Sequence, residues 1–392
     1  MIEINKNIAG ILPSGTMVFS AKAKALKESG KRILDFTAGE PDFDTPLSVC
    51  EEAVRSIRDG FTRYTSGSGI VQLRTSICEK LRRDNGIEVS EDGVIVTPGG
   101  KDALWLSLYT VLNVGDEVII PDPSWVSYDA MVRSCGAIPV HVMFSAPDFT
   151  FDVAVLERAV TSKTKALVIN FPNNPTGAVM GRTQVEELVL FMKRHRNIVL
   201  VSDEIYEKLV YDGAVNYSPA AFSEIADRVI TVNGFSKSCA MTGWRLGYLA
   251  CNTDIAKYIY RIFQHTITCT NSFVQRAGVE ALACISETEK MRLSYQKRRD
   301  MFMTGLNSVH GVSANLPHGA FYAWVKFNIP TITSSADLCN FLLEQAGIAG
   351  VPGSAFCKTD EPYVRFCFAA PERELSEAVS KLRFLLGSCS SL

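Results

Sequence analysis

Two residues that could carry out chemistry follow runs of mostly apolar residues. Asp203 follows the run at 198–202, and Lys237 follows the run at 229–232 after a short turn. Such runs predict buried parallel strands, and open α/β sheets bind ligands beyond the carboxyl ends of their strands. Arg245 stands eight positions after Lys237. A lysine that can lose its proton, beside an anion-binding arginine, predicts imine chemistry on a phosphorylated carbonyl compound.

Lys237 and Asp203 also have ordinary structural interpretations. A lone lysine is most often an exposed loop residue, and an aspartate after a strand can cap the next helix. The neighbouring residues favour chemistry instead. Small residues on both sides of Lys237 would let a flat ligand approach the backbone. Asp203 ends an apolar strand, where a carboxylate is costly to bury unless a cationic group meets it.

Two further segments could hold a flat, phosphorylated molecule. Gly99 and Gly100 stand at a predicted strand-to-helix turn, where backbone N–H groups at the positive end of a helix bind phosphate. Ile95 occupies the position of the first glycine of a Walker A loop, so the turn is not of that type. Trp125 follows a predicted strand and offers a flat face to a heteroaromatic ring, although core packing is the commoner fate of tryptophan.

The motifs and their order resemble a known family. The pattern G-F-S-K-x-x-x-M-T-G-x-R-L-G at 234–247, A-G-E-P-D-F at 38–43 and N-P-T-G at 174–177 are similar to motifs of the class I aminotransferases, the aspartate aminotransferase superfamily with the type I fold. The likeness covers nearly the whole chain. It implies pyridoxal 5'-phosphate as the cofactor and a homodimer with shared active sites.

The resemblance implies roles for individual residues around the cofactor. Lys237 would form a Schiff base with it and, once displaced by substrate, move a proton as general base and then acid. Asp203 would keep the pyridine nitrogen protonated, and Tyr206 and Asn174 would bind the phenolic oxygen. Gly234 stands where the family often has a hydroxyl residue that binds phosphate. The other expected cofactor contacts are Trp125, which stacks, the phosphate ligands Gly99, Gly100, Ser236 and Arg245, Lys101 at the same turn, and Tyr64, which would reach across a dimer interface. On sequence grounds alone, Tyr64 is equally a loop tyrosine packed at a domain edge.

The same resemblance implies how substrate is held. Arg365, inside a predicted strand, would bind the substrate α-carboxylate as a bidentate pair, and Gly39 would approach the same group. Lys101 with Ser14 and Thr16 resembles subgroup Ib of the aspartate aminotransferases, where these positions bind the distal carboxylate. The remaining expected substrate contacts are Trp125 and Asn174. The expected reaction is ping-pong transamination of L-aspartate with 2-oxoglutarate.

Other activities remain open from the sequence. Some members of subgroup Ib accept prephenate through a basic residue before Pro13, but here Leu12 takes that place. An aromatic, prephenate or alanine aminotransferase is the alternative, and a carbon–sulfur lyase or racemase on the same fold would share Lys237, Asp203 and Arg365. A transcription regulator would need an additional DNA-binding domain, for which the segment before the A-G-E-P-D-F motif is too short.

The elements that position these residues predict an α/β fold. Seven strands alternate with helical patterns and should form a mostly parallel sheet, with a smaller α+β domain beside it. The strands are expected at 94–97, 117–120, 138–143, 166–170, 198–202, 229–233 and 246–250. The smaller domain is expected to contain strands at 320–327 and 363–368 and a helix at 373–386.

The length of 392 residues suits two domains better than one simple core. We expect an N-terminal arm at 1–15 without regular structure and a large cofactor-binding domain at 46–285. Residues 16–45 and 286–392 should together form the small domain. A helix is expected to begin near Phe19 and to end before Gly30.

Composition excludes several classes of function. Lys and Arg number 40 against 42 Asp and Glu, so no global field favours nucleic acid or a membrane surface. The eleven cysteines form no C-x-x-C pair and the five histidines show no metal-ligand spacing, so we expect free thiols and no metal site. With neither a secretory signal nor a long apolar stretch in evidence, a cytoplasmic protein is expected.

Overall fold

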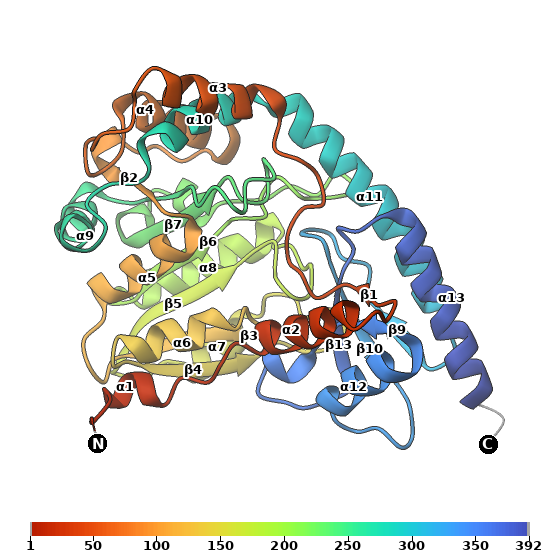
Figure 1. The fold of residues 1–392 in the computed structure, drawn as a ribbon. Coiled ribbons are helices and arrows are strands. Elements are labelled where there is room, and N and C mark those ends of the chain that lie inside the picture. Colours follow the sequence, from red (N-terminus) through yellow and green to blue (C-terminus); the bar gives the residue numbers. More distant parts are fainter. Residues whose placement is uncertain (1, 390–392) are drawn as a thin grey trace.

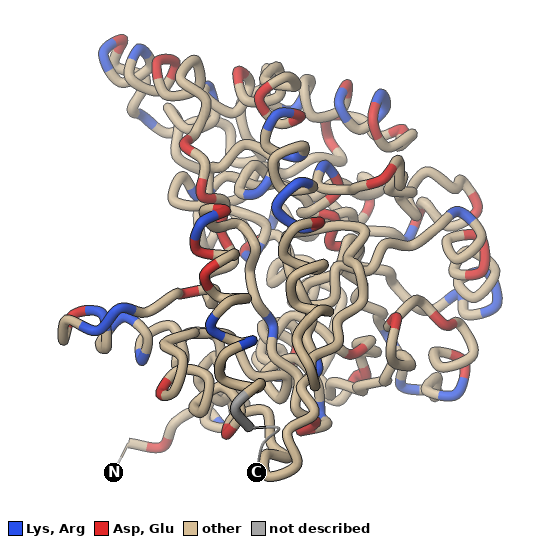
Figure 2. Tube along the Cα trace, turned by 90° about the vertical axis from the view of Figure 1, so that its right-hand side faces the viewer, with Lys and Arg blue, Asp and Glu red and all other residues tan. Residues whose placement is uncertain are grey.

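The computed structural model describes residues 2–389 and contains two layered regions. A large sheet lies between helices on both faces, and a smaller group of strands and helices lies beside it at the lower right of Figure 1. Over the side shown in Figure 2, basic and acidic residues are interspersed along the trace. None of the described helices is long and apolar enough to cross a membrane.

The large sheet has seven strands in the order β2-β8-β7-β6-β5-β3-β4. All neighbours are parallel except β8, which runs antiparallel to both β2 and β7. The strands are β2 (Val94–Thr97), β3 (Glu117–Asp122), β4 (Ile138–Met143), β5 (Thr164–Asn170), β6 (Val199–Asp203), β7 (Val229–Gly234) and β8 (Gly247–Ala250). The expected seven-stranded, mostly parallel sheet is confirmed, and each strand end lies within two residues of its predicted position.

Alternating side chains bury the two faces of the sheet under different helices. On β5, Ala166 and Val168 pack with α5, α6 and α9, whereas Leu167 and Ile169 pack with α7 and α8. This alternation is the two-residue period of a strand covered on both faces. The helices are α3 (Leu47–Arg58), α4 (Val71–Lys80), α5 (Gly100–Val111), α6 (Ser127–Ser134), α7 (Val153–Ala159), α8 (Arg182–Arg194), α9 (Thr253–Thr266) and α10 (Ser272–Ala283).

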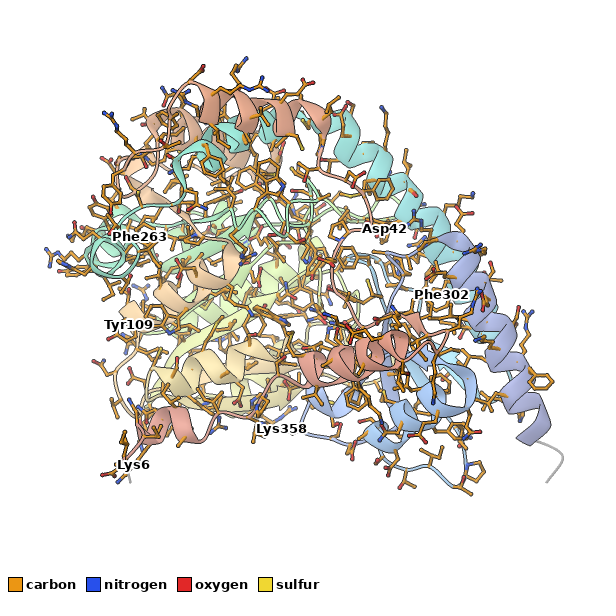
Figure 3. All side chains as sticks on the ribbon, viewed as in Figure 1. Lys6, Asp42, Tyr109, Phe263, Phe302 and Lys358 are labelled. Carbon is orange, nitrogen blue, oxygen red and sulfur yellow. The ribbon has the colours of Figure 1, made fainter. Side chains whose placement is uncertain are left out.

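The smaller region joins the N-terminal segment to the C-terminal part of the chain. Its strands are β1 (Leu34–Asp35), parallel to β11 (Ile348–Ala349), and the antiparallel set β12 (Val351–Pro352), β13 (Tyr363–Cys367), β10 (Tyr322–Phe327) and β9 (Val312–Ala314). Its helices are α2 (Gly15–Glu28), α11 (Ile285–Asn307), α12 (Ser335–Ala346) and α13 (Glu372–Cys389). Phe302 of α11, labelled in Figure 3, packs with Phe36 and Phe366 at ring-centroid distances of 6.0 and 6.3 Å.

The N-terminal arm differs from its prediction. A short helix, α1 (Lys6–Ala9), forms inside the segment that was expected to lack regular structure, because the Asn5 side chain accepts a hydrogen bond from the backbone N–H of Asn7. Helix α2 begins at Gly15, four residues before the expected start, with Ser14 at the N-cap position. The arm therefore ends where α2 begins, and this helix start carries the hydroxyl groups of Ser14 and Thr16.

The strand register aligns the loops that carry chemistry. Asn170 of β5 is the partner of Asp203 of β6, and Asp203 is in turn beside Val232 of β7. Gly247 of β8 pairs with both Thr97 of β2 and Gly234 of β7. The carboxyl ends of β5, β6 and β7 and the turn after β2 therefore meet at one edge of the sheet.

Candidate active site

A cavity of about 470 Å³ opens at this edge of the sheet and is also lined by the N-terminal segment and by the smaller region. It brings together nearly all of the site residues predicted from sequence. Those that line it are Ser14, Thr16, Gly39, Gly100, Lys101, Trp125, Asn174, Asp203, Tyr206, Ser236, Lys237, Arg245 and Arg365. Gly99 and Tyr64 are outside this set.

Lys237 stands in the turn that follows β7. Its Nζ donates a hydrogen bond to the carbonyl oxygen of Gly39 in the A-G-E-P-D-F loop. Burial lowers the pKa of the Lys237 ammonium to about 8. About a tenth of the side chain is therefore the neutral amine at pH 7, which is the form that attacks a carbonyl or accepts a proton.

Asp203, the last residue of β6, is 4% exposed and pairs with no cation among the described residues. Its Oδ2 accepts a hydrogen bond from the Tyr128 hydroxyl at 2.7 Å, and its Oδ1 accepts one from the backbone N–H of Ile205 at 3.2 Å. Burial raises the pKa of the Asp203 carboxyl to about 6. A cationic ligand group at this carboxylate would remove that penalty.

Tyr128 was missed in the sequence analysis although it holds Asp203 in place. It is 1% exposed and comes from α6, far from Asp203 in the chain. The signal available was weak: Tyr128 lies three positions after Trp125, and the two rings make an edge contact at 5.4 Å. Only the fold brings the hydroxyl to the carboxylate.

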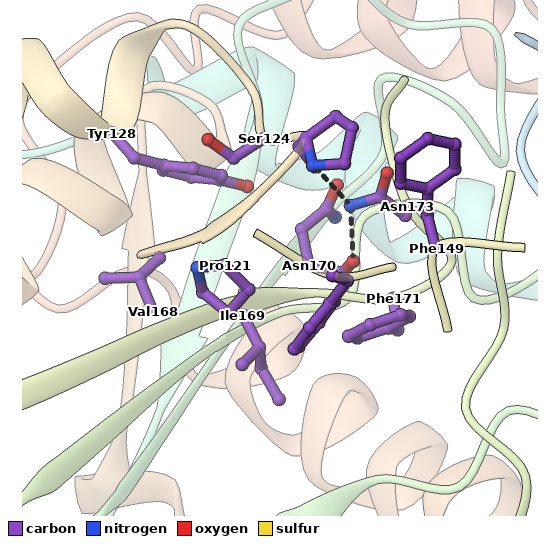
Figure 4. Close-up of a pocket in the computed structure, with 11 residues that line it drawn as sticks. Pro121, Ser124, Tyr128, Phe149, Val168, Ile169, Asn170, Phe171 and Asn173 are labelled. Atoms are coloured by element: carbon purple, nitrogen blue, oxygen red, sulfur yellow. Dashed lines mark hydrogen bonds between the residues drawn. The ribbon is translucent and has the colours of Figure 1, made fainter. Parts of the chain in front are cut away.

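An asparagine network holds the loop after β5. The Asn170 side chain donates to the Asp203 carbonyl at 2.9 Å and accepts from the backbone N–H of Asn174 at 2.9 Å. Asn173 donates to the carbonyl oxygens of Pro123 and Asn170 at 3.4 and 3.3 Å, as the dashed lines in Figure 4 show. These bonds fix the loop to the ends of β5 and β6, and Asn174 lines the cavity.

Arg365 of β13 is 2% exposed and points into the cavity, although alternation along its strand left its direction open. Its Nη1 donates to Oδ1 of Asn174 at 3.1 Å, and its Nη2 donates to the Thr37 carbonyl at 2.6 Å. Its Nε has no hydrogen-bond partner in the described part of the chain. A buried guanidinium with only neutral partners is suited to bind a carboxylate.

Tyr206 and Tyr322 form a second pair that borders the cavity. Their hydroxyl oxygens are 2.7 Å apart, and burial raises the pKa of Tyr206 well above its usual range. The Arg365 guanidinium lies 4.5 Å from the centre of the Tyr322 ring. A Cβ at Gly39 would clash with the Tyr322 hydroxyl, so glycine is required there. Tyr322 was also missed in the sequence analysis.

The turn after β2 and the start of α5 form an end of the cavity suited to an anion. Arg245 donates only to the carbonyl oxygens of Thr242 and Pro98, at 2.9 and 3.4 Å, and pairs with no carboxylate of the described residues. Gly99 packs against it, since a Cβ there would lie 2.6 Å from the Arg245 Nη2. Gly100 opens α5, and Ser236 is 8% exposed beside the cavity. Backbone donors, a hydroxyl and a guanidinium thus converge.

The mouth of the cavity carries a lysine and two hydroxyl groups. The Nζ of Lys101 lies 4.8 Å from the centre of the Trp125 ring and makes no ion pair within the described residues. Burial, followed by the charge of Arg245, lowers the pKa of Lys101. The hydroxyl oxygens of Ser14 and Thr16 are 2.8 Å apart. Leu12 is 85% exposed and does not line the cavity.

Comparison with known proteins identifies the family of this chain. The family model described as "Aminotransferase class I and II" matches residues 31–382. The chain belongs to the class I and II aminotransferases. The predicted resemblance is therefore confirmed.

Relatives and solved structures of this aminotransferase resemble it over nearly its full length. It is 39% identical to an aspartate/prephenate aminotransferase of Thermus thermophilus, covering 99% of this chain and 100% of the relative. It is 38% identical to aromatic-amino-acid aminotransferase 2 of Thermococcus litoralis, covering 90% and 92%. The crystal structure of an aspartate aminotransferase from Rhizobium meliloti matches with a TM-score of 0.94 at 35% identity, covering 100% of this chain and 99% of that one.

Two predicted residues of the aminotransferase do not line this cavity. Gly99 acts indirectly, because it lets the Arg245 guanidinium approach the turn after β2. Tyr64 is 85% exposed in the loop before α4. An exposed tyrosine can reach a second subunit, and its role there stays a prediction.

Proposed function

We propose that this aminotransferase transfers the amino group of L-aspartate to 2-oxoglutarate by a ping-pong mechanism with pyridoxal 5'-phosphate. The observation that supports it best is the set of unpaired cations around Lys237. Arg365, Arg245 and Lys101 line the same cavity, and none of them pairs with a carboxylate of the described residues. A phosphate and two substrate carboxylates would match these three cations.

The cavity fits the cofactor by its donors and its buried acid. Arg245, Ser236 and the backbone at Gly100 would hold the phosphate, and Trp125 would cover the ring. Asp203, whose burial is otherwise costly, would accept a hydrogen bond from the protonated ring nitrogen. When bound, the cofactor supplies an electron-accepting ring that stabilises negative charge at the substrate Cα.

The protein side chains would then hold the substrate and move one proton. Arg365 would bind the α-carboxylate through its guanidinium, including the unpartnered Nε, and Asn174 is hydrogen-bonded to that guanidinium. The Lys237 amine, with its pKa lowered to about 8, would take the proton from the substrate Cα and later donate it to the cofactor carbon C4′. The hydroxyl group of Tyr206 would donate a hydrogen bond to the phenolic oxygen of the cofactor. Burial behind Tyr322 and Thr37 excludes water from the arginine.

Substrate choice rests on the mouth of the cavity. Lys101, with Ser14 and Thr16, would bind the distal carboxylate of aspartate or glutamate. An aromatic or prephenate substrate is the second candidate, because Trp125 and Leu104 give the same cavity an apolar wall. The Thermus relative is named for aspartate and prephenate, and the Thermococcus relative for aromatic amino acids.

Assembly, domain division and compartment are part of the same proposal. The solvent-exposed Tyr64 and apolar side chains of α3, such as Leu47 and Val54, support a homodimer. The division into an arm at 1–15, a large domain at 46–285 and a small domain formed by 16–45 and 286–392 is supported by the pairing of β1 with β11. The ten cysteines whose side chains are described are all free thiols, which supports a reducing compartment such as the cytoplasm.

The test is to follow the amino group itself. We would supply L-aspartate labelled with 15N, together with unlabelled 2-oxoglutarate, to the purified holoenzyme. We expect 15N-labelled glutamate and an equal amount of oxaloacetate. Release of labelled ammonia without an acceptor acid would instead indicate a lyase. A kcat/KM for phenylalanine or prephenate above that for aspartate would make the second candidate the main function.

A further inference from the structure

A second cavity, of about 350 Å³, lies on the other side of the segment that carries Lys237. It shares no lining residue with the active-site cavity. Its walls come from the end of β7 and the residues after it, from the π-helical turn Leu81–Asn85 that continues α4, and from the junction of α10 with α11. The proposed aminotransferase mechanism uses none of these groups.

Asn233 gives the cavity an unused hydrogen-bond donor. It is 3% exposed, and its Oδ1 accepts a hydrogen bond from the backbone N–H of Gly234 at 2.7 Å. Its Nδ2 has no partner in the described part of the chain. A buried polar group without a partner destabilises the fold, so a ligand that offers an acceptor oxygen to this amide would be favoured.

The charged groups of the wall leave donors rather than acceptors free. Glu207 is bonded by both Lys80 and Asn85, and Asp84 is bonded by Lys208 at 2.7 Å. Lys80 also donates to Oδ1 of Asn85 at 2.6 Å, which uses two of its three donors. Glu289, the third lining carboxylate, is bonded by Arg292 at 2.7 Å, and Arg83, the third lining cation, is bonded to Asp84 at 2.7 Å. Cations and carboxylates of the wall are thus equal in number, but Lys80 and Lys208 each keep N–H groups that these bonds do not use. The unused donors favour a ligand with acceptor oxygens over a cation.

The rest of the wall is apolar and aromatic. The rings of Phe235 and Tyr248 meet edge to face at 6.1 Å, and Ala281, Leu282 and Ile285 also line the cavity. An aromatic ring of a ligand would gain burial and edge contacts here. A dicarboxylate such as aspartate would place a second charge against these side chains at a cost.

We propose that this cavity binds a small aromatic monocarboxylate, with its carboxylate at Asn233 Nδ2 and the lysine ammonium groups and its ring against Phe235 and Tyr248. Its site is coupled to Lys237 through the backbone. Phe235, Ser238 and Cys239 line the cavity on either side of the lysine, and Thr288 of α11 donates to the Ser238 carbonyl at 2.8 Å. A ligand here would therefore change turnover without competing with substrate.

The test uses 3-(4-fluorophenyl)propionate as the probe and the full-length holoenzyme. Excess succinate occupies the groups of the active site that would bind the substrate carboxylates. A saturable 19F signal that persists in its presence therefore reports the second cavity. We expect such a signal and, in a crystal grown with the probe, density for its carboxylate beside Asn233. The absence of a saturable signal, or density for water alone in the cavity, would overturn the proposal.

Two variants make the assignment specific. Asn233→Asp keeps the shape but replaces the donor by a repelling carboxylate, and we expect the probe to bind about tenfold more weakly or worse. Asn271→Asp, at an exposed position, is the matched control. Leu282→Trp fills the cavity from its wall and should abolish the signal even if Asn233→Asp folds poorly. Unchanged binding in both cavity variants would contradict the site.

Aspartate turnover without the probe, measured on the same samples, reports the proposed function separately. A wild-type enzyme that transaminates but binds no probe would overturn only this inference. An enzyme that binds the probe in the second cavity but does not use aspartate would overturn only the proposed substrate.

Discussion

The floor and the mouth of the active site are built in different ways. On the floor, Asp203 and Asn174 are 4% and 5% exposed, and each is fixed by hydrogen bonds from neighbouring strands or loops. At the mouth, Lys101 pairs with no carboxylate among the described residues, and the hydroxyl groups of Ser14 and Thr16 are hydrogen-bonded to each other. The floor is organised before ligand arrives, whereas the mouth needs ligand to complete it. Reaction type should therefore depend on the floor and substrate choice on the mouth.

The largest effect is expected at Lys237. Lys237→Ala removes the amine that would move the α-proton, and turnover should fall by roughly 10⁴-fold or more. The variant should still bind pyridoxal phosphate, which its absorbance after gel filtration would report. Normal turnover in this variant would contradict the catalytic role proposed for Lys237.

Arg365 should come next, because it joins the floor to the substrate. Arg365→Lys keeps the charge but loses the planar pair of donors, and kcat/KM should fall by roughly 10²–10³-fold for every amino acid. Arg182→Lys, an exposed position on α8 paired with Glu186, is the matched control and should behave as wild type. A loss confined to one substrate would indicate that Arg365 selects the substrate and does not bind the α-carboxylate that all amino acids share.

Lys101 tests the mouth. In Lys101→Ser, kcat/KM for aspartate and glutamate should fall by roughly 10–100-fold, because one charge-assisted contact to the distal carboxylate is lost. The value for phenylalanine should stay within a factor of about 3, since that substrate has no distal charge. Equal losses for both substrates would erase the proposed division between floor and mouth.

Tyr128 gives the smallest effect and the clearest pH dependence. Its hydroxyl stabilises the ionised Asp203, so Tyr128→Phe should raise the Asp203 pKa above about 6. The affinity for cofactor needs the ionised carboxylate, so it should fall at a higher pH in the variant than in the wild type as the solution is made more acidic. Cofactor dissociation constants measured from pH 5 to 8 would show the shift, and superimposable profiles would contradict it.

The same raised pKa makes a prediction about the cofactor-free protein. A carboxyl whose folded pKa lies above its unfolded value stabilises the fold most below the unfolded value, and that stability is lost as pH rises through about 6. The free energy of unfolding should therefore fall between pH 4 and 6 by more in the cofactor-free wild type than in Asp203→Asn. Denaturant titrations at several pH values would measure it.

Residues of the floor could be predicted from sequence where they directly follow an apolar run that indicates a strand. Apolar runs located β6 and β7, and a polar residue just beyond such a run is conspicuous, so Asp203 and Lys237 were found. Tyr128 and Tyr322 could not be found in this way, because they act on residues 75 and 116 positions away through contacts that only the fold creates. The direction of Arg365 was hidden because both faces of β13 are buried.

The mouth was predicted mainly through resemblance, and the structure added local detail. The start of α2 at Gly15 explains how Ser14 and Thr16 come to the cavity, and it depends on a helix start earlier than the apolar pattern indicated. Helix α1 was missed because four residues are too few for a periodic signal.

The central claim is tested most directly by one turnover with L-aspartate and no acceptor acid. We predict one equivalent of oxaloacetate per active site, no ammonia, and renewed release only when 2-oxoglutarate is added. Continuous product formation without an acceptor, or no oxaloacetate from an enzyme that reacts with an aromatic amino acid, would contradict the account.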